Sequence, residues 1–324
     1  MPTRTLPCYV AVGADRIAWS SADAATWTSA PMPKLAEVAL ATDGQQVVAV
    51  GGRKITVTKD GTTWSVPQRV GASLNAVAYG NGRWVAVGDD GALLTSTDAA
   101  GWQHVAPATS EDLLAVATSG TQWVAVGGTA ILTSSDALSW HVAVTRHELL
   151  GVATNGTSWV VVGQDTVATS ADGRRFHFEH QVWNFGVVSD PWENNGFTFP
   201  PPDPPHVSAS PSVWVAWGLD SWGDPGSVFA QSLDGRSWSS IEGWATRPTN
   251  VPSALSWDGT RWVALVTTWH PPTTTSPGST GWEIRTATTD ATDAALLPRL
   301  ADWTVTATDA SGDVPSALVA TCGG

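Results

Sequence analysis

The stretch "SSDALSW" at residues 134 to 140 decides the fold, because close copies of it recur along the chain. The copies are "SADAATW" (21 to 27), "TKDGTTW" (58 to 64), "STDAAGW" (96 to 102), "SADGRRF" (170 to 176) and "SLDGRSW" (232 to 238). Each copy has Ser or Thr first, Asp third and an aromatic residue seventh. The first five aromatics follow one another at steps of 37, 38, 38 and 36 residues. Such a fixed period indicates a repeat architecture, either a solenoid or a propeller.

The unit around each copy reads as four short strands. Its fullest example, residues 74 to 105, has an apolar strand, a Gly-containing turn, a second strand "RWVAVG", a third strand "ALLTST" and a fourth that opens at the aromatic. No segment shows the 3.6-residue apolar period of a helix. Four-stranded units of this length, repeated radially, are the blades of a β-propeller. We therefore predict an all-β fold in which residues 1–324 form a single domain.

The later units are irregular. For the unit that ends at Trp238 we assign the first strand to residues 183–190 and the second to 212–218. In the last unit the copy is broken, with Asp290 separated from its expected aromatic, Trp303. We expect insertions at about 190–211, 269–281 and 291–302. Counting the broken copy gives seven repeats, and hence a prediction of seven four-stranded blades.

The two ends of the sequence complement each other. Residues 314 to 324, "VPSALVATCGG", match a first strand, whereas the N-terminal repeat begins directly at a second strand, "CYVAVG" (8 to 13). We therefore expect the C-terminal strand to complete the first blade. Overlaying the repeats places Cys8 and Cys322 three residues apart across a tight hairpin, a separation that suits a disulfide. We predict that these two cysteines form a bond that closes the ring.

Six copies that keep one spacing make the chain resemble the Asp-box (BNR, sialidase-type) β-propellers over essentially its whole length. Within that family it is more similar to bacterial propeller lectins than to sialidases. The resemblance implies that the box aspartate is a turn residue between the third and fourth strands, on the face away from the family's active site. A carboxylate there can accept backbone N–H groups, while the aromatic packs between sheets. These structural aspartates are Asp23, Asp60, Asp98, Asp136, Asp172, Asp234 and Asp290.

The sialidase machinery itself does not carry over. The family's Arg-Ile-Pro motif is absent from the sequence, and its nucleophile is a tyrosine. Tyr9 and Tyr79, the two tyrosines of the chain, occupy strand positions that other repeats fill with Trp or Thr. We interpret both as packing or surface-strand residues, and we predict no sialidase activity.

Composition excludes several classes of function. The formal net charge is −13, with three Lys, thirteen Arg and no basic run, so nucleic acids are not expected as partners. No stretch approaches the roughly twenty apolar residues of a membrane helix. Residues 1–13 lack the apolar run and cleavage site of a secretory signal. Because a disulfide implies an oxidising compartment, we expect a soluble protein that is extracellular or surface-exposed.

Acidic and histidine residues are the candidates for catalysis and metal binding. Six carboxylates fall on first strands or on loops of one face: Glu37, Asp89, Asp90, Glu111, Asp112 and Glu148. They fit either the paired carboxylates of a glycan-processing hydrolase or lyase or a solvated acidic rim. In "HFEH" (177 to 180), His177 and Glu179 share one side of a strand and His180 faces the other. At most two ligands converge there, so we predict neither a metal nor a cofactor.

Tryptophan is the most informative residue type, with twenty in the chain. Boxes and second strands leave a surplus, mostly in the irregular repeats: Trp183, Trp192, Trp217, Trp222, Trp244, Trp257, Trp269 and Trp282. An exposed indole beside polar side chains suits a sugar ring. The predicted ligand-binding residues are Trp222, Trp244, Trp269, Asp220, Arg247 and His270. The alternative is that these tryptophans only pin long loops to the body.

Three functional hypotheses follow. The first is a non-catalytic, carbohydrate-binding module whose partner is a glycan or glycoconjugate. The second is an enzyme that uses acidic residues such as Glu37 at the mouth of the central channel. The third is a protein-assembly scaffold, similar to the propeller factors that help build photosystems.

Overall fold

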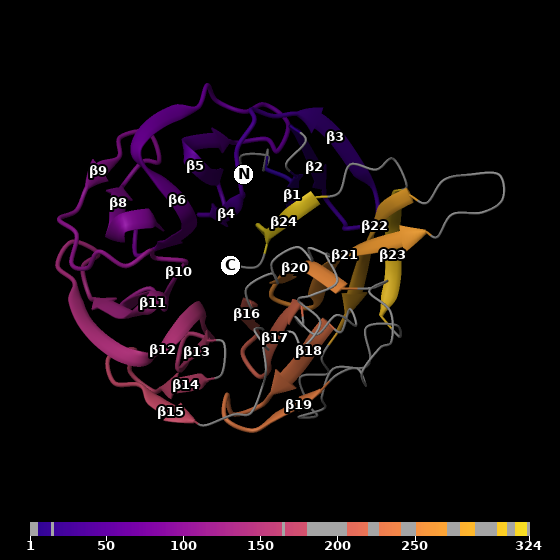
Figure 1. The fold of residues 1–324 in the computed structure, drawn as a ribbon. Helices are drawn as coiled ribbons and strands as arrows, with labels where there is room; N and C mark the ends of the chain where they lie inside the picture. The colour runs from indigo at the N-terminus through magenta and orange to yellow at the C-terminus, as the bar shows by residue number, and fades with distance from the viewer. Residues whose placement is uncertain are drawn as a thin grey trace, which may run out of the picture.

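The computed structural model is an all-β propeller, which confirms the predicted architecture (Figure 1). It describes residues 6–13, 16–163, 166–179, 206–219, 227–240, 251–270, 279–288, 303–309 and 315–322. Five hydrogen-bonded sheets follow one another around a ring (Figure 1). The one helical element in these ranges is a short 3-10 turn, η1 (Asp89–Gly91).

Three of the sheets are four-stranded, and their strands all run antiparallel to their neighbours. Their orders are β24(Pro315–Ala320)-β1(Tyr9–Gly13)-β2(Ile17–Ser21)-β3(Trp27–Pro31), β16(His206–Ala209)-β17(Trp214–Leu219)-β18(Ser227–Ser232)-β19(Trp238–Ser240) and β20(Val251–Trp257)-β21(Trp262–His270)-β22(Ser279–Ala287)-β23(Thr304–Asp309).

Two further sheets are six-stranded. Their orders are β4(Ala39–Thr42)-β5(Val47–Thr58)-β6(Gln68–Gly80)-β7(Arg83–Gly88)-β8(Ala92–Ser96)-β9(Gln103–His104) and β10(Ala115–Thr118)-β11(Trp123–Ser134)-β12(His141–Thr154)-β13(Trp159–Gly163)-β14(Val167–Ser170)-β15(His177–Glu179).

Packing between repeats accounts for the apolar strands. In β1 and β13 every residue is buried, because each sheet is covered on both faces by its neighbours. The buried residues form seven hydrophobic clusters, and each cluster combines residues of two consecutive repeats. Each also contains one of the seven predicted aromatics: Trp27, Trp64, Trp102, Trp140, Phe176, Trp238 and Trp303. Full burial of a large apolar side chain stabilises a fold by roughly 1.5–3 kcal/mol; Trp303 is buried in this way, and the other six aromatics are half-buried and contribute less.

The Asp box is a hydrogen-bonded turn in every described copy. In the copy at 134 to 140, the Asp136 carboxylate accepts the backbone N–H groups of Leu138 and Ser139 at 2.8 and 2.7 Å. The Ser134 hydroxyl accepts the N–H of Ala137 at 2.9 Å. Ala137 lies in the left-handed region with φ 61°, and Gly173 takes the same conformation in the next copy with φ 66°. The box is therefore a fixed turn that delivers its aromatic to the inter-repeat core.

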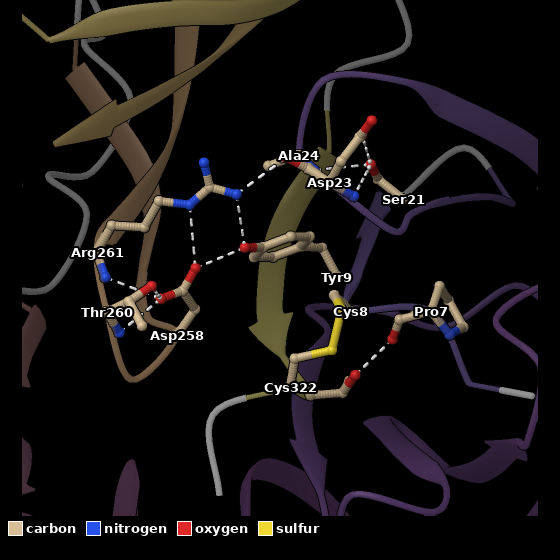
Figure 2. The surroundings of a disulfide bond; sticks show 11 residues. Pro7, Cys8, Tyr9, Ser21, Asp23, Ala24, Asp258, Thr260, Arg261 and Cys322 are labelled. Carbon is tan, nitrogen blue, oxygen red and sulfur yellow. Dashed lines mark hydrogen bonds and ion pairs between the residues drawn. A yellow bond between two sulfur atoms is a disulfide. The ribbon is translucent and has the colours of Figure 1, made fainter. Parts of the chain in front are cut away.

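The ring closes where the sequence predicts. β24 pairs with β1, with Tyr9 opposite Ala320 and Val12 opposite Ala317. A disulfide joins Cys8 to Cys322, whose Cα atoms are 4.8 Å apart (Figure 2). In other repeats the same hairpin position is a chain turn held by a side chain, as where Asn155 accepts the N–H of Ser158. The disulfide thus links the first and second strands of the first sheet, at the place where a continuous turn of the chain links them in the other repeats.

A buried polar cluster adds to this closure (Figure 2). The Tyr9 hydroxyl of β1 donates to the Asp258 carboxylate, 2.5 Å away in the turn between β20 and β21. Arg261, in the same turn, donates to the Tyr9 oxygen at 2.9 Å, to Asp258 at 3.1 Å and to the backbone oxygen of Asp23 at 2.9 Å. The interpretation of Tyr9 as a packing residue therefore missed its hydroxyl, which links the last repeat to the first.

Removing the Tyr9 hydroxyl is expected to destabilise the ring. Tyr9→Phe leaves the buried Asp258 carboxylate short of one donor, which costs about 1–3 kcal/mol. Equilibrium unfolding in urea measures the difference. The matched control is Tyr79→Phe, because Tyr79 is half-buried and lies outside the cluster. If both variants lost the same free energy of unfolding, the cluster would contribute nothing specific.

Breaking the disulfide is expected to lower stability without removing the sheet. In the chain-entropy model, closing a loop of more than three hundred residues stabilises the folded state by roughly 5 kcal/mol. The double variant Cys8→Ser, Cys322→Ser should therefore unfold at lower denaturant concentration than the oxidised protein. Oxidised and reduced wild-type protein with the same midpoint would contradict this expectation.

Three details of the irregular repeats differ from the prediction. The first strand that pairs with β17 is β16 (His206–Ala209) and not residues 183–190, because the Ser210 hydroxyl accepts the N–H of Val213 and closes a tight hairpin. Consequently the expected insertion at 190–211 ends in a strand. The expected insertion at 269–281 is likewise strand at both ends, because β21 and β22 stay paired as far as His270 and Ser279.

The surplus of loop tryptophans is also smaller than expected. Trp217 is buried against the side chains of the neighbouring repeat, and Trp282 packs against Trp19 and Trp27. Trp257 is partly buried beside Trp262. These three indoles, on β17, β22 and β20, fill space between repeats and are not loop residues.

Candidate functional site

The predicted ligand-binding residues fall largely outside the described ranges. Four of them lie outside these ranges: Asp220, Trp222, Trp244 and Arg247. The box aspartate Asp290 and the metal-ligand candidate His180 also lie outside them. The backbone of Trp269 and His270 is described, and it forms the last two residues of β21, opposite Thr280 and Ser279. The carbohydrate site therefore stays a prediction.

The six acidic rim residues serve in part to hold loops. The Asp89 carboxylate accepts the Asn75 amide at 2.9 Å, and Asp112 accepts the backbone N–H of Asp90 at 2.8 Å. Glu111 accepts the Thr129 hydroxyl at 3.4 Å. The bond between Asp90 and Asp112 connects consecutive repeats, and the other two hold loops within one repeat. These bonds favour the interpretation of an acidic rim with a structural role.

The carboxylates with shifted pKa values are those of the turns. Backbone N–H groups of Ser139 and Leu138 hold the pKa of Asp136 at about 2. The pKa values of Asp23, Asp98 and Asp172 are lowered in the same way by the backbone N–H groups two and three residues after each aspartate. At Asp258 burial by itself raises the pKa, but hydrogen bonds from Tyr9, Thr260 and Arg261 outweigh it and bring the pKa to about 2.

These shifts predict how the protein loses stability in acid. Because each lowered pKa lies below the unfolded value of 3.8, the stabilisation is complete above about pH 4 and is lost as the pH falls toward 2. Urea unfolding measured from pH 2 to pH 7 should show a plateau and then a steep fall. Asp136→Asn removes one titrating group, so its fall should be shallower, whereas Ser135→Ala should follow the wild type; a stability independent of pH between 2 and 4 would contradict the assignment.

A metal centre finds no support in the described part of the chain. Within it, no group of three or more His, Cys, Asp or Glu side chains is placed to hold an ion. His177 is exposed on β15. Nor is any helix among the described residues long and apolar enough to cross a membrane.

Three hollows of the described surface lie between consecutive repeats at equivalent places. Three grooves, named here after one residue each, are lined by the third and fourth strands of one repeat and the box of the next. The Trp64 groove has a cavity volume of about 600 Å³, the Trp27 groove about 250 Å³ and the Phe178 groove about 330 Å³. Repetition of one groove geometry follows from repetition of the box.

The Phe178 groove combines apolar and cationic side chains. It lies between the outer part of β12 and β15, and it is lined by Val144, Arg146, His147, Arg174, Phe176 and Phe178. His147 stacks on Phe178 with ring centroids 5.3 Å apart. Arg174 donates to the side-chain oxygen of Gln122 at 3.3 Å. Sequence reasoning missed this groove, although the alternation of Val142, Val144 and Arg146 on an outer strand was a signal for it.

Comparisons with known proteins identify the fold and no family. No protein-family model and no curated protein matches the sequence. Among solved structures, YCF48 bound to a D1 peptide is 17% identical, with a TM-score of 0.52 over 90% of this chain and 95% of that one. YCF48 from Cyanidioschyzon merolae is 12% identical, with a TM-score of 0.52 over 82% and 94%.

A putative 6-phosphogluconolactonase from Bacteroides uniformis is 12% identical, with a TM-score of 0.56 over 96% of this chain and 97% of that chain. At these identities the likeness concerns the fold. The chain is thus a β-propeller that resembles YCF48 and other propellers in architecture.

Proposed function

We propose that this chain is a seven-bladed propeller that works as a non-catalytic binding module, with carbohydrate as its ligand. The observation that carries the proposal is the paired arm of β21 and β22, which brings Trp269 and His270 beyond the point where other blades turn.

Two observations support seven blades. The inner strands contact one another in a circle, in the order β24, β4, β6, β10, β12, β16, β20 and back to β24. Each six-stranded sheet also changes register where two repeats meet: β5 pairs with β6 at Gly52 and Leu74, then at Lys54 and Arg69. β11 and β12 show the same change between Gly128 and Ala130. Dividing both sheets at these shifts gives seven four-stranded units, in agreement with the seven core clusters.

The arm supports a ligand site on the last blade. β21 and β22 are nine residues long and pair continuously from Trp262 and Ala287 out to His270 and Ser279. By contrast, β7 and β8 pair only from Trp84 to Gly88. The arm extends outward from the ring (Figure 1). Tryptophan and histidine, the last two residue types of β21, are ones that suit sugar C–H groups and hydroxyls.

A protein segment is the second candidate ligand, and exposed aliphatic residues favour it. Val66 is 90% exposed beside the Trp64 groove, and Val144 is 77% exposed beside the Phe178 groove. Side chains of this kind beside a groove are typical of surfaces that bind proteins. The YCF48 structure with a bound D1 peptide gives one propeller of this architecture with a peptide ligand.

A glycan array tests the proposed function. The wild-type protein should bind a defined set of glycans, and the double variant Trp222→Ala, Trp269→Ala should lose at least tenfold in affinity with an unchanged circular dichroism spectrum. Val66→Ser serves as the control, because Val66 is exposed on another blade. If the wild-type protein bound no glycan on the array, or if the double variant bound as tightly as the wild type, this site would be ruled out.

A further inference from the structure

The outer edge of the β12 sheet presents an unusual combination of groups. Residues His141–Val144 pair on one side with Thr133–Ala130 of β11. On the other side the described strands offer no partner to this segment, and β15 is likewise paired only with β14. Edge strands with free N–H and C=O groups accept an added strand, and proteins usually protect them with charge or cover.

Here the edge is apolar instead of protected. Seven large hydrophobic side chains are exposed in the described part of the chain. Two of them, Val144 and Phe178, line this groove, and a third, Val142, lies on the same edge of β12. Val142 and Val144 alternate along the strand, so both project to the same face of the sheet. A strand added to β12 would bury their side chains together with that of Phe178.

Charge at the groove selects the partner. Arg146 and Arg174 both line it, and no ion pair within 4 Å is found for either in the described ranges. Arg174 donates to the neutral Gln122, and its charge also helps to lower the pKa of Asp172. Glu148 and Glu179 lie nearby on the same two strands, but neither lines the groove. On a chain with a net charge of −13, two arginines beside an apolar edge favour an anionic ligand.

The size of the groove narrows the choice further. A volume of about 330 Å³ lies at the lower end of the range for ligand pockets, and it suits one or two side chains. An extended peptide satisfies all three features: its backbone pairs with the strand edge, one apolar side chain enters the groove, and acidic side chains reach the arginines.

We propose that the edge of β12 and the Phe178 groove form a docking site for an extended peptide segment that carries an aliphatic or aromatic residue and an acidic residue two positions apart, on one face. The site lies on different repeats from the arm of β21 and β22. A test of this peptide site is therefore independent of any test of the proposed carbohydrate site.

Selection from a phage library of random decapeptides tests the proposal, with the oxidised full-length protein as bait. Peptides that carry Asp or Glu two positions away from Val, Leu, Ile or Phe should be enriched, and an enriched decapeptide should bind in fluorescence anisotropy. Arg146→Glu, Arg174→Glu should weaken that binding at least tenfold. Arg16→Glu, Arg53→Glu is the matched control, because it changes the net charge equally at two exposed arginines elsewhere and should bind nearly as the wild type does.

Other outcomes would overturn the proposal. Enrichment without acidic residues, no enrichment at all, or equal weakening by both double variants would each exclude an acidic partner at this groove. Light scattering tests the remaining occupant, a second copy of the chain. A dimer that dissociates in Val144→Glu and not in Val66→Glu would assign the edge to self-association instead.

Discussion

A ring of sheets is stable only if its last member packs on its first, and in this protein that contact carries the whole architecture. Every sheet is covered by a neighbour on each face, so a ring left open would expose two apolar faces to water. Pairing of β24 with β1 prevents this, because it places strands from opposite ends of the sequence in one sheet. The disulfide and the Tyr9 cluster reinforce the same junction, where chain connectivity is missing.

The box aspartates illustrate how an acidic protein can use its carboxylates without a catalytic role. A carboxylate that accepts two backbone N–H groups is held in its ionised form. The charged carboxylate is used to hold the turn together. The turn then orients the aromatic side chain that fills the space between repeats. The seven core clusters therefore depend on small polar turns at the rim of the molecule as much as on the apolar strands.

Much of this fold could be predicted from the sequence, because a repeat states the same structural requirement many times. The position of Trp102 relative to Asp98, or of Cys8 relative to Cys322, follows from aligning one copy with another. The Tyr9, Asp258 and Arg261 cluster could not be read in this way, since it joins residues that differ from their counterparts in the other repeats. Likewise β16 was misplaced because a Pro-rich stretch obscured a match: "VSASPSVW" (207 to 214) has the spacing of "VATNGTSW" (152 to 159). The Phe178 groove arises from side chains on two separate strands, and sequence alone gives no distance between them.

The bond between Cys8 and Cys322 has a topological consequence. These residues are 314 positions apart, so the backbone and the disulfide together make a covalent circle that runs through every sheet of the ring. A single cut in any exposed turn of that circle leaves one connected molecule whose new ends are held in place by the sheets on either side. The oxidised propeller should therefore tolerate circular permutation. It should also stay in one covalently connected piece after a single proteolytic cut, whereas the same cut would divide a chain without the disulfide into two pieces.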